Sequence, residues 1–404
     1  MPRRRAAAMV VGAGLLFVVG TSVQAGWLLV LASILLGAAL VGLLLPRRMV
    51  RGLQVERRSP SEASQGDDVL VEVIVANRGR GVKLGLEVED THVANARVSV
   101  PPLAPGERVV IGTVRRAARR GLQEDTPVRI RSAAPFGVAE SRRRLEVPGR
   151  TLVLPALVRL PSTPLVDASP TPEHAIHSAP RRGTGPEYLG IREYRVGDSM
   201  RHVHWPSTAR HGQVMVREFE QEHTRRLAIV VDTLADAGEE ETPLDTACSV
   251  AASVAFSALG RGHGVRLLAA REGSVDALMR AEPPHLLEWL AELPAFGGLA
   301  LAQMLPELGA RLRGVQTVLL AVPTWRANAG LPDAVAAVQA VAPRVAAALI
   351  EAHGFPADRR APVMSEREAD RLAEGLLARG VAVYRVRAKE DLAACLARPT
   401  VLAS

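Results

Sequence analysis

Aromatic residues, cysteine and lysine are all scarce in this chain of 404 residues. Aromatics make up only 3% of it, too few to build stacking platforms for bases. Because no zinc-finger, RNP-type or helix-turn-helix pattern is present either, we expect no nucleic-acid binding. The two cysteines, Cys248 and Cys395, lie in apolar, helix-forming contexts and form no C-x-x-C pair. They indicate reduced, buried thiols of a cytosolic domain. Lysine occurs only as Lys83 and Lys389 beside abundant arginine, which indicates codon composition and no particular function.

Sequence motifs of several enzyme classes are also missing. The chain has no G-x-x-x-x-G-K-[ST] run, so it has no P-loop with which to hydrolyse a nucleotide. It has no H-E-x-x-H pattern and no recognisable Ser/His/Asp arrangement. We therefore expect a protein that binds no cofactor.

Positive charge is concentrated in the first part of the chain. Residues 1–150 contain 23 Arg and Lys against 13 Asp and Glu, a balance of +10, whereas residues 151–404 contain 27 against 29, a balance of −2. The basic part adjoins an apolar N-terminus. This combination indicates contact with an anionic membrane surface.

Two apolar runs, residues 6–23 and 27–45, predict a transmembrane helical hairpin over residues 1–51. Each run is long enough to cross a hydrocarbon layer of about 30 Å. Arginines flank both outer ends and none lies in the connecting turn. The positive-inside rule then places the N-terminus and everything after Pro46 in the cytoplasm. The leading hypothesis is a protein of the bacterial inner membrane. A cleaved signal peptide ending near Ala25 is the alternative, although the second run would itself anchor the chain.

Three further patterns predict the rest of the architecture. Residues 52–150 show short strands of period two separated by Pro and Gly corners, which is typical of a β-sandwich. Residues 151–180 are Pro-rich and predict an extended linker. Residues 226–404 alternate apolar strands with helices, which predicts an α/β domain with a doubly wound parallel sheet.

Residues 181–225 hold the densest group of charges, glycines and aromatics in the chain. Their spacing, G-x-G-x-E-Y-x-G-I-R-E-Y-R-x-G-D followed by R-x-x-H-W, A-R-x-G and V-R-E-F-E, resembles the signature of the domain-of-unknown-function 58 family over about forty residues. The chain departs from that signature at Val196, Ser199 and Pro206. The resemblance implies a membrane protein with a von Willebrand factor A-like domain after the signature. It also implies work beside a MoxR-type AAA+ ATPase in envelope-related or complex-maturation processes.

The leading hypothesis is a non-enzymatic, membrane-anchored adaptor or scaffold. Dense charges of both signs must pair or meet a partner, because an unpaired buried ion is costly. The residues expected to form this structural or partner-binding network are Glu187, Arg192, Glu193, Asp198, Arg201, His204, Trp205, Arg210, Arg217 and Glu218.

Asp232 follows an apolar strand at the position where such sheets bind ligands. The resemblance implies a D-x-S-x-S loop for Mg²⁺ there, but the chain reads Asp232-Thr233-Leu234-Ala235-Asp236 and lacks both serines. We therefore predict no metal. Asp232 is either a vestigial ligand or a residue that bonds to backbone at the N-terminus of the next helix, and the second interpretation is favoured.

A membrane-tethered, metal-dependent hydrolase is the rival hypothesis. Asp198, His202 and His204 would carry it, because alternation along a strand puts both imidazoles on one face. A third hypothesis is a structural tether between membrane and cytoplasm with no dedicated ATPase. The client, the pathway and the oligomeric state do not follow from the sequence.

Overall fold

The computed structural model describes residues 2–90, 97–124, 127–160, 164–167, 188–194, 200, 203–219, 226–235, 241–355, 362–388 and 390–400. The chain divides into two compact units, Met1–Ala156 and Leu157–Ser404. Each unit is described by itself.

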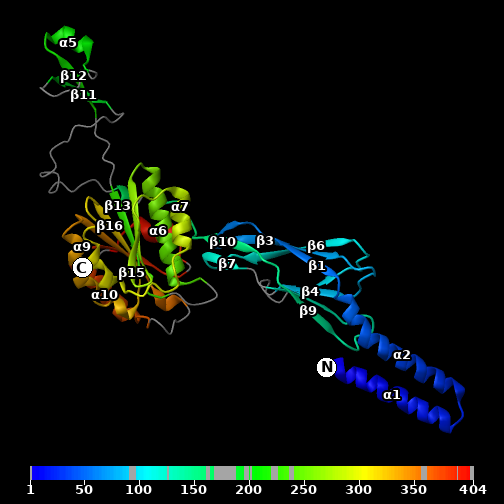
Figure 1. Cartoon of the computed structure of the whole chain (residues 1–404). Coiled ribbons are helices and arrows are strands. Elements are labelled where there is room, and N and C mark those ends of the chain that lie inside the picture. Colours follow the sequence, from blue (N-terminus) through cyan, green and yellow to red (C-terminus); the bar gives the residue numbers. More distant parts are fainter. Residues whose placement is uncertain are drawn as a thin grey trace. The chain divides into compact units, whose positions relative to one another are not determined.

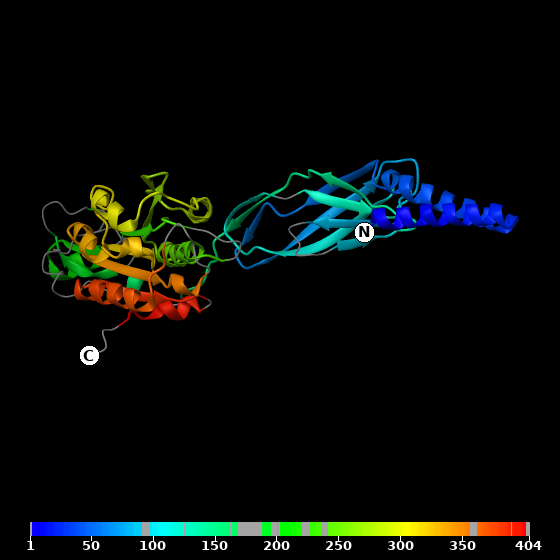
Figure 2. The same ribbon diagram turned by 90° about the horizontal axis from the view of Figure 1, so that it is seen from below.

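The first unit begins with two apolar helices, α1 (Pro2–Ser22) and α2 (Gly26–Met49), which lie side by side (Figures 1 and 2). Their mean hydropathies over membrane-length windows are 1.6 and 2.8, so both are long and apolar enough to span a membrane. Pro46 does not end the second helix, which continues to Met49. A third helix, α6 (Pro243–Gly260), also meets the length and composition limits, but 78% of it is buried inside its own unit.

Ten strands follow in the first unit, arranged in three sheets. The sheet orders are β1-β3-β6, β5-β4-β8-β9 and β2-β10-β7. All neighbouring pairs are antiparallel except β10 with β2. The bounds are β1 Leu53–Arg58, β2 Glu62–Ser64, β3 Asp68–Asn77, β4 Leu86–Asp90, β5 Arg97–Val100, β6 Arg108–Arg116, β7 Gly121–Glu124, β8 Val128–Ser132, β9 Ser141–Leu145 and β10 Arg150–Leu154.

One hydrophobic core joins the sheets β1-β3-β6 and β5-β4-β8-β9 to the end of α2. Val75 from β3 and Ile130 from β8 lie in the same buried cluster as Met49 from the helix. The ammonium group of Lys83 donates a hydrogen bond of 2.7 Å to the carbonyl of Arg48. The second apolar helix is therefore packed directly against the strands and is not merely tethered to them.

The second unit is built on a six-stranded sheet of order β15-β14-β13-β16-β17-β18. Five strands are parallel, as the alternating pattern predicts, but β15 runs antiparallel to β14 at the edge. A tight turn at Glu272 and Gly273, both with positive φ, makes this hairpin possible. The bounds are β13 Arg226–Val231, β14 Gly264–Arg271, β15 Ser274–Leu278, β16 Thr317–Pro323, β17 Arg344–Ile350 and β18 Ala382–Val386.

Helices cover both faces of this sheet. Alternate residues of β13 enter different cores: Ile229 packs with α6, whereas Val230 packs into a separate cluster. The first cluster also takes side chains from α7 (Pro283–Ala291) and α11 (Leu392–Ala397). The second takes them from α8 (Leu301–Met304), η2 (Leu305–Leu308), α9 (Leu331–Gln339) and α10 (Glu366–Ala378).

The prediction of an extended linker over residues 151–180 is wrong at two places. Residues 151–154 lie in β10, which pairs with β2 and β7. Leu160, Leu165 and Val166 are buried in the core beside α6, the last two on the short helix α3 (Pro164–Asp167). The apolar side chains between the prolines are buried in this core. The free energy gained by burying them outweighs the preference of proline for an extended chain. Residues 168–180 lie outside the described residues.

Candidate functional site

The carboxyl ends of β13 and β16 form the point where ligands bind in many open α/β sheets. The chain goes from β13 to β14 on one side and then returns to β16 on the other, so the strand order reverses between β13 and β16. Such a reversal leaves a crevice outside the carboxyl ends of the two strands. Asp232 follows β13 and Thr324 follows β16, so both stand at this crevice.

Asp232 is buried and bonded within its own domain. One carboxylate oxygen accepts the backbone N–H of Leu234 at 3.0 Å, and the other accepts the side-chain amide of Asn328 at 2.5 Å. Burial raises the pKa of Asp232 to about 6, against the opposing effect of these two bonds. The backbone bond lies within the loop and not at the N-terminus of the next helix, which begins only at Pro243, and Asn328 is a partner that the sequence did not reveal. Asp236, the other carboxylate of the loop, lies outside the described residues.

Apolar side chains fill the space beside Asp232. Trp325 is buried together with Ala235 and Ala352, and Leu234 and Val363 pack against them. The backbone of Trp325 forms a bridge to Val363, which closes the segment over the end of the sheet. A small apolar cluster of residues that follow β13, β16 and β17 is therefore buried at the carboxyl end of the sheet.

The glycine pair Gly297 and Gly298 has a packing role beside the loop that follows β13. The N–H of Gly297 donates to the carbonyl of Thr233 at 2.7 Å. A Cβ atom at Gly297 would come within 2.1 Å of the Thr233 hydroxyl oxygen and 2.5 Å of the Ala270 carbonyl. Only glycine allows this approach. The loop thus packs directly on the residue after Asp232.

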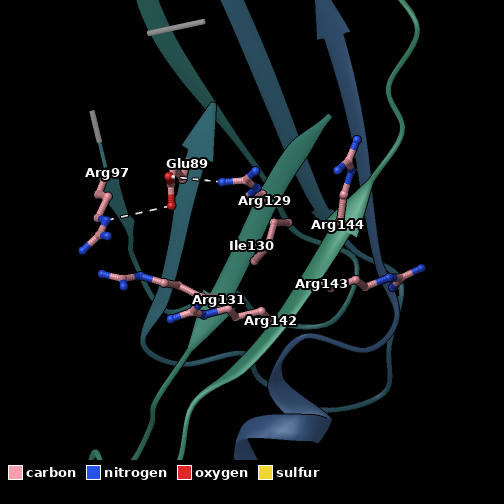
Figure 3. Close-up of a pocket in the computed structure, with 8 residues that line it drawn as sticks. All are labelled: Glu89, Arg97, Arg129, Ile130, Arg131, Arg142, Arg143 and Arg144. Atoms are coloured by element: carbon pink, nitrogen blue, oxygen red, sulfur yellow. Dashed lines mark ion pairs between the residues drawn. The ribbon is translucent and has the colours of Figure 1, made fainter. Parts of the chain in front are cut away.

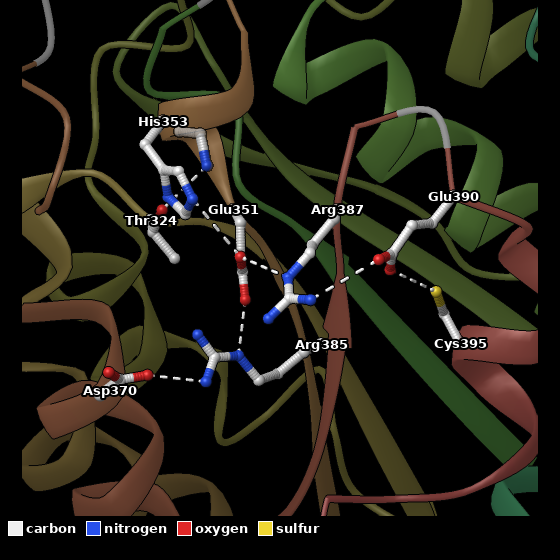
Figure 4. A network of polar contacts seen from close by, with 9 residues as sticks. Thr324, Glu351, His353, Asp370, Arg385, Arg387, Glu390 and Cys395 are labelled. Atoms are coloured by element: carbon white, nitrogen blue, oxygen red, sulfur yellow. Dashed lines mark hydrogen bonds and ion pairs between the residues drawn. The ribbon is translucent and has the colours of Figure 1, made fainter. Parts of the chain in front are cut away.

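A second buried carboxylate, Glu351, lies just beyond the end of β17 (Figure 4). Its side chain is only 2% exposed. One oxygen accepts from Nε of Arg385 at 2.6 Å and the other from Nε of Arg387 at 3.1 Å. His353 lies 3.6 Å away on the same side. Both carboxylate oxygens are therefore engaged by guanidinium groups of the neighbouring strand.

Further acidic groups extend this network. Arg385 also reaches Asp370 at 2.7 Å, and Arg387 reaches Glu390 at 3.7 Å. Burial lowers the pKa of Arg385, but its bonds to Asp370 and Glu351 outweigh burial and raise the pKa overall. For Arg387, the bond to Glu351 raises the pKa. The arginines stay charged, and each is shared between two carboxylates.

The Glu351 network is not expected from the sequence, although part of its pattern is visible there. Glu351 follows an apolar strand in the same way that Asp232 does, and Arg385 and Arg387 alternate at the end of another strand. Their contact depends on the pairing of β17 with β18, which joins residues more than thirty positions apart.

The segment that carries the family signature, residues 181–225, contains a short antiparallel ribbon and a helix. The ribbon is β11 (Tyr188–Glu193) with β12 (Met215–Phe219), and the helix is α5 (Trp205–His211). His204 caps the helix, because its Nδ1 accepts the N–H of Ser207 at 3.3 Å. The same atom lies 2.8 Å from the Ser207 hydroxyl.

The predicted network residues are only partly within the described residues. Trp205 begins α5 and is 65% exposed, while Glu193 and Arg210 are exposed on β11 and in the last turn of α5. The backbone register sets Arg217 opposite Ile191 and Arg192 opposite Val216, with Glu218 opposite Gly190. Glu187, Asp198, Arg201 and His202 lie outside the described residues. The expected Arg–Glu pairing of this segment therefore stays a prediction.

Within the described part of the chain, no group of three or more His, Cys, Asp or Glu side chains is arranged to hold a metal ion. Cys248 is buried, and burial raises the pKa of the Cys395 thiol to about 11, with Glu390 adding to the effect. That thiol is therefore a poor nucleophile at neutral pH.

Residues 190–348 match the model of the family described as protein of unknown function DUF58. The match runs from β11 to β17 and supports assignment of this segment to the DUF58 family. No curated protein matches the chain.

Two solved structures of a GH20 exo-β-N-acetylglucosaminidase from Vibrio harveyi, one in complex with N-acetylglucosamine and one an inactive mutant, are 8% identical to this chain. Their TM-scores are 0.19 and 0.20, and each alignment covers 81% of this chain. The chain spans 65% of the length of those proteins. At such TM-scores the likeness supports neither a common fold nor a common activity.

Proposed function

We propose that this chain is a membrane-anchored adaptor without enzymatic activity of its own. In this proposal α1 and α2 hold it in the inner membrane, and both soluble units lie in the cytoplasm with the arginines that flank the helices. The first unit is a β-sandwich and the second a von Willebrand factor A-like domain that has lost its metal. Its partner is a MoxR-type AAA+ ATPase, and the setting is envelope-related or complex maturation, as the family resemblance implies.

The observation that carries the proposal is the occupied crevice at the end of the sheet. Trp325 and its apolar neighbours fill the space beside Asp232, and Asn328 bonds to its carboxylate. A Mg²⁺ site needs several oxygen ligands open to the ion. Here the buried carboxylate has used both oxygens on groups of its own domain.

The strand pattern supports the von Willebrand factor A-like interpretation, and the shared core supports the sandwich. A mostly parallel sheet with helices on both faces and an acidic residue after its first strand is the arrangement that the resemblance implies. In the first unit, two sheets share one buried core, which is the defining feature of a sandwich.

A partner surface is supported by the exposed side chains of the signature segment. Trp205, Met200 and Tyr194 are all exposed there. Trp and Tyr are the residues most often found to dominate binding energy at protein interfaces. We place the contact with the ATPase on this segment, centred on Trp205.

The test is capture of the ATPase by the full chain crosslinked in native membranes. We compare the wild type with Trp205→Ala and with Phe296→Ala, a matched change at an aromatic residue that is 49% exposed elsewhere in the second unit. Loss of a central aromatic residue is worth about 2 kcal/mol or more at an interface, so Trp205→Ala should reduce capture about 30-fold. Phe296→Ala should leave capture unchanged.

Two results would contradict the proposal. If the wild-type chain captures no AAA+ ATPase, the partner is wrong. If Trp205→Ala captures as much as Phe296→Ala, and both variants unfold at the wild-type temperature, the surface is wrong.

A further inference from the structure

The outer face of the sheet β5-β4-β8-β9 carries two rows of charged residues that cross the strands. The register aligns Arg97, Glu89, Arg129 and Arg144 in one row and Ser99, Glu87, Arg131 and Arg142 in the next. In each row an arginine of β8 stands directly opposite an arginine of β9. Like charges in such opposite positions destabilise a sheet. A negatively charged ligand over this edge would relieve the repulsion.

These arginines line a cavity of about 420 Å³ (Figure 3). Its wall consists of Glu89, Arg97, Arg129, Ile130, Arg131, Arg142, Arg143 and Arg144. Glu89 lies between Arg97 and Arg129 but reaches neither closely, at 3.9 and 3.8 Å. Guanidinium groups present paired donors that match the oxygens of a phosphate. The cavity is therefore built from the side chains that suit phosphate best.

Nearby glutamates neutralise only part of the charge. Glu87 pairs with Arg131, Glu140 with Arg142 at 2.8 Å, and Glu146 with Arg144 at 3.1 Å. The bond from Arg142 holds the pKa of Glu140 below its ordinary value, so this partner is ionised. Arg143 turns to the other face of the sheet, where its Nη1 lies 3.5 Å from the carbonyls of Val50 and Leu53. With Glu89 included, four glutamates therefore face the other five arginines of the wall, which leaves a surplus of one positive charge.

The hairpin β8–β9, which carries five of the six arginines of the wall, packs against the helix α2. Its tip, residues 133–139, contains no charged residue. A Cβ atom at Gly42 of α2 would lie 2.9 Å from Cβ of Val138, so the tip touches the helix backbone. Gly42 lies three residues inside the apolar run that ends at Leu45, a distance of about 4–5 Å along a helix. Val138 is thus level with the apolar span.

The remaining features of the tip fit a place at the membrane boundary. Phe136 is 56% exposed although its neighbours in the tip are small or buried. A Cβ atom at Gly137 would lie 3.7 Å from Nη1 of Arg5, at the beginning of α1. Arg131 and Arg142 flank the tip, and strands rise about 3.3 Å per residue, which sets these arginines about 7–10 Å behind it. The headgroup layer on one side of a bilayer is about 5–7 Å thick.

We propose that the tip of the β8–β9 hairpin inserts at the membrane boundary beside α2, and that the arginine cavity behind it binds the phosphate headgroup of an anionic phospholipid. A lipid is favoured over a free phosphate because the tip of the hairpin that carries these arginines packs against α2, a helix long and apolar enough to span the bilayer. This site is separate from the adaptor surface on α5, so either proposal can fail without the other.

The lipid is tested with the full chain reconstituted in nanodiscs that contain phosphatidylcholine and phosphatidylglycerol. Spin-labelled forms of each lipid report the fraction held by the protein. The variant Arg129→Gln/Arg144→Gln removes one opposed pair, and Arg108→Gln/Arg150→Gln removes the same charge at exposed positions outside the cavity. An arginine near a membrane surface is worth about fivefold in lipid affinity. We expect the cavity variant to lose about 25-fold in phosphatidylglycerol preference and the control variant to retain it.

Three outcomes would overturn the headgroup site. In the first, the wild type holds phosphatidylglycerol and phosphatidylcholine equally. In the second, both double variants lose the same amount of preference for phosphatidylglycerol. In the third, inorganic phosphate at constant ionic strength displaces phosphatidylglycerol completely. That result would identify a free phosphate as the natural ligand.

Insertion of the tip is tested with an environment-sensitive dye on a single cysteine. Phe136→Cys and Phe296→Cys are compared in a Cys248→Ala/Cys395→Ala background, because the two phenylalanines are similarly exposed. At position 136 we expect blue-shifted emission that lipid-bound quenchers reduce, and at position 296 the emission of a dye in water. Equal emission at the two positions in nanodiscs would show that the tip stays outside the membrane.

Discussion

Replacement of Asp232 by asparagine should stabilise the second unit at neutral and alkaline pH. The pKa of this buried carboxyl is raised from its ordinary 3.8 to about 6. Between these values the folded protein keeps a proton that the unfolded chain has released, so stability falls as pH rises through about 6. A difference of about two pKa units corresponds to about 3 kcal/mol of folding free energy lost above that pH. Asparagine has no ionised form and avoids this loss.

The surroundings of Asp232 can accept the new amide. Its oxygen would still accept the N–H of Leu234, as the carboxylate does now. Its NH₂ group would donate to the side-chain oxygen of Asn328, which has no partner among the described residues, once the Asn328 amide turns over. That rotation sacrifices a 3.3 Å bond to the carbonyl of Pro323, at a cost of about 1 kcal/mol. The net gain at pH 8 is therefore about 2 kcal/mol.

Thermal unfolding of the full chain in detergent measures this effect. Cys248 is completely buried in α6, so a thiol-reactive fluorogenic dye reports the unfolding of this unit in a Cys395→Ala background. For a unit of this size, 2 kcal/mol corresponds to a rise of about 4–8 °C. The rise should appear at pH 8 and vanish near pH 4, where the wild-type carboxyl is protonated. Asp333→Asn, the same change on the exposed surface of α9, loses only an exposed ion pair with Arg379 and should raise the midpoint at neither pH.

A lower midpoint for Asp232→Asn at pH 8 would refute this reasoning. It would mean that the domain needs an ionised carboxylate at this position, as a protein that binds a metal there would. The adaptor proposal would then lose its main support.

Three further predictions follow from the packing of both units. Glu351→Ala leaves Arg385 and Arg387 without their buried partner and should lower the free energy of unfolding in urea by about 3 kcal/mol. The control Arg379→Ala, which removes the exposed pair of Arg379 with Asp333, should cost less than about 1 kcal/mol. Gly42→Leu drives a side chain into Val138 and should destabilise the first unit by about 1–3 kcal/mol, measured as faster proteolysis of the hairpin, while Gly37→Leu, where nothing lies within 4 Å, should not. His204→Ala removes the cap of α5 and should lower stability by about 1 kcal/mol without changing the zinc or manganese content measured by elemental analysis; stoichiometric metal that this variant loses would favour a hydrolase.

Local patterns predicted most elements of the second unit. Apolar runs such as residues 226–231 become parallel strands whatever their neighbours, because both faces of the sheet are covered. The capping box at Ser365 and Glu368 begins α10 as its spacing predicts. Strand β15 does not follow from the sequence because it is short, contains Asp276 and lies at the edge of the sheet. Its partly buried side chains leave no clear run or alternation of apolar residues.

Strand β9 illustrates a different limit. Its sequence, Ser-Arg-Arg-Arg-Leu, has the composition of a solvated charge run and gave no expectation of a strand. Its conformation is fixed by pairing with β8, which sets Arg143 opposite the buried Ile130 and turns Arg142 and Arg144 to the other face. Such pairing is not encoded in the five residues themselves. The Glu351 network depends in the same way on contacts between distant strands.

The two charged clusters differ in what they leave for a partner. Glu351 is buried between two arginines, and each arginine has another carboxylate in reach, so three carboxylates surround two arginines and no positive charge in that network lacks a partner. A ligand there would have to replace internal bonds and would gain little. On the outer face of β8 and β9, Arg129, Arg142 and Arg144 are more than half exposed, arginines stand opposite one another, and a positive surplus remains after the four neighbouring glutamates are counted. An anion that binds there meets arginines whose charge the protein itself does not fully neutralise. For this reason we place the chain's binding functions on its outer surfaces and not at the end of its parallel sheet.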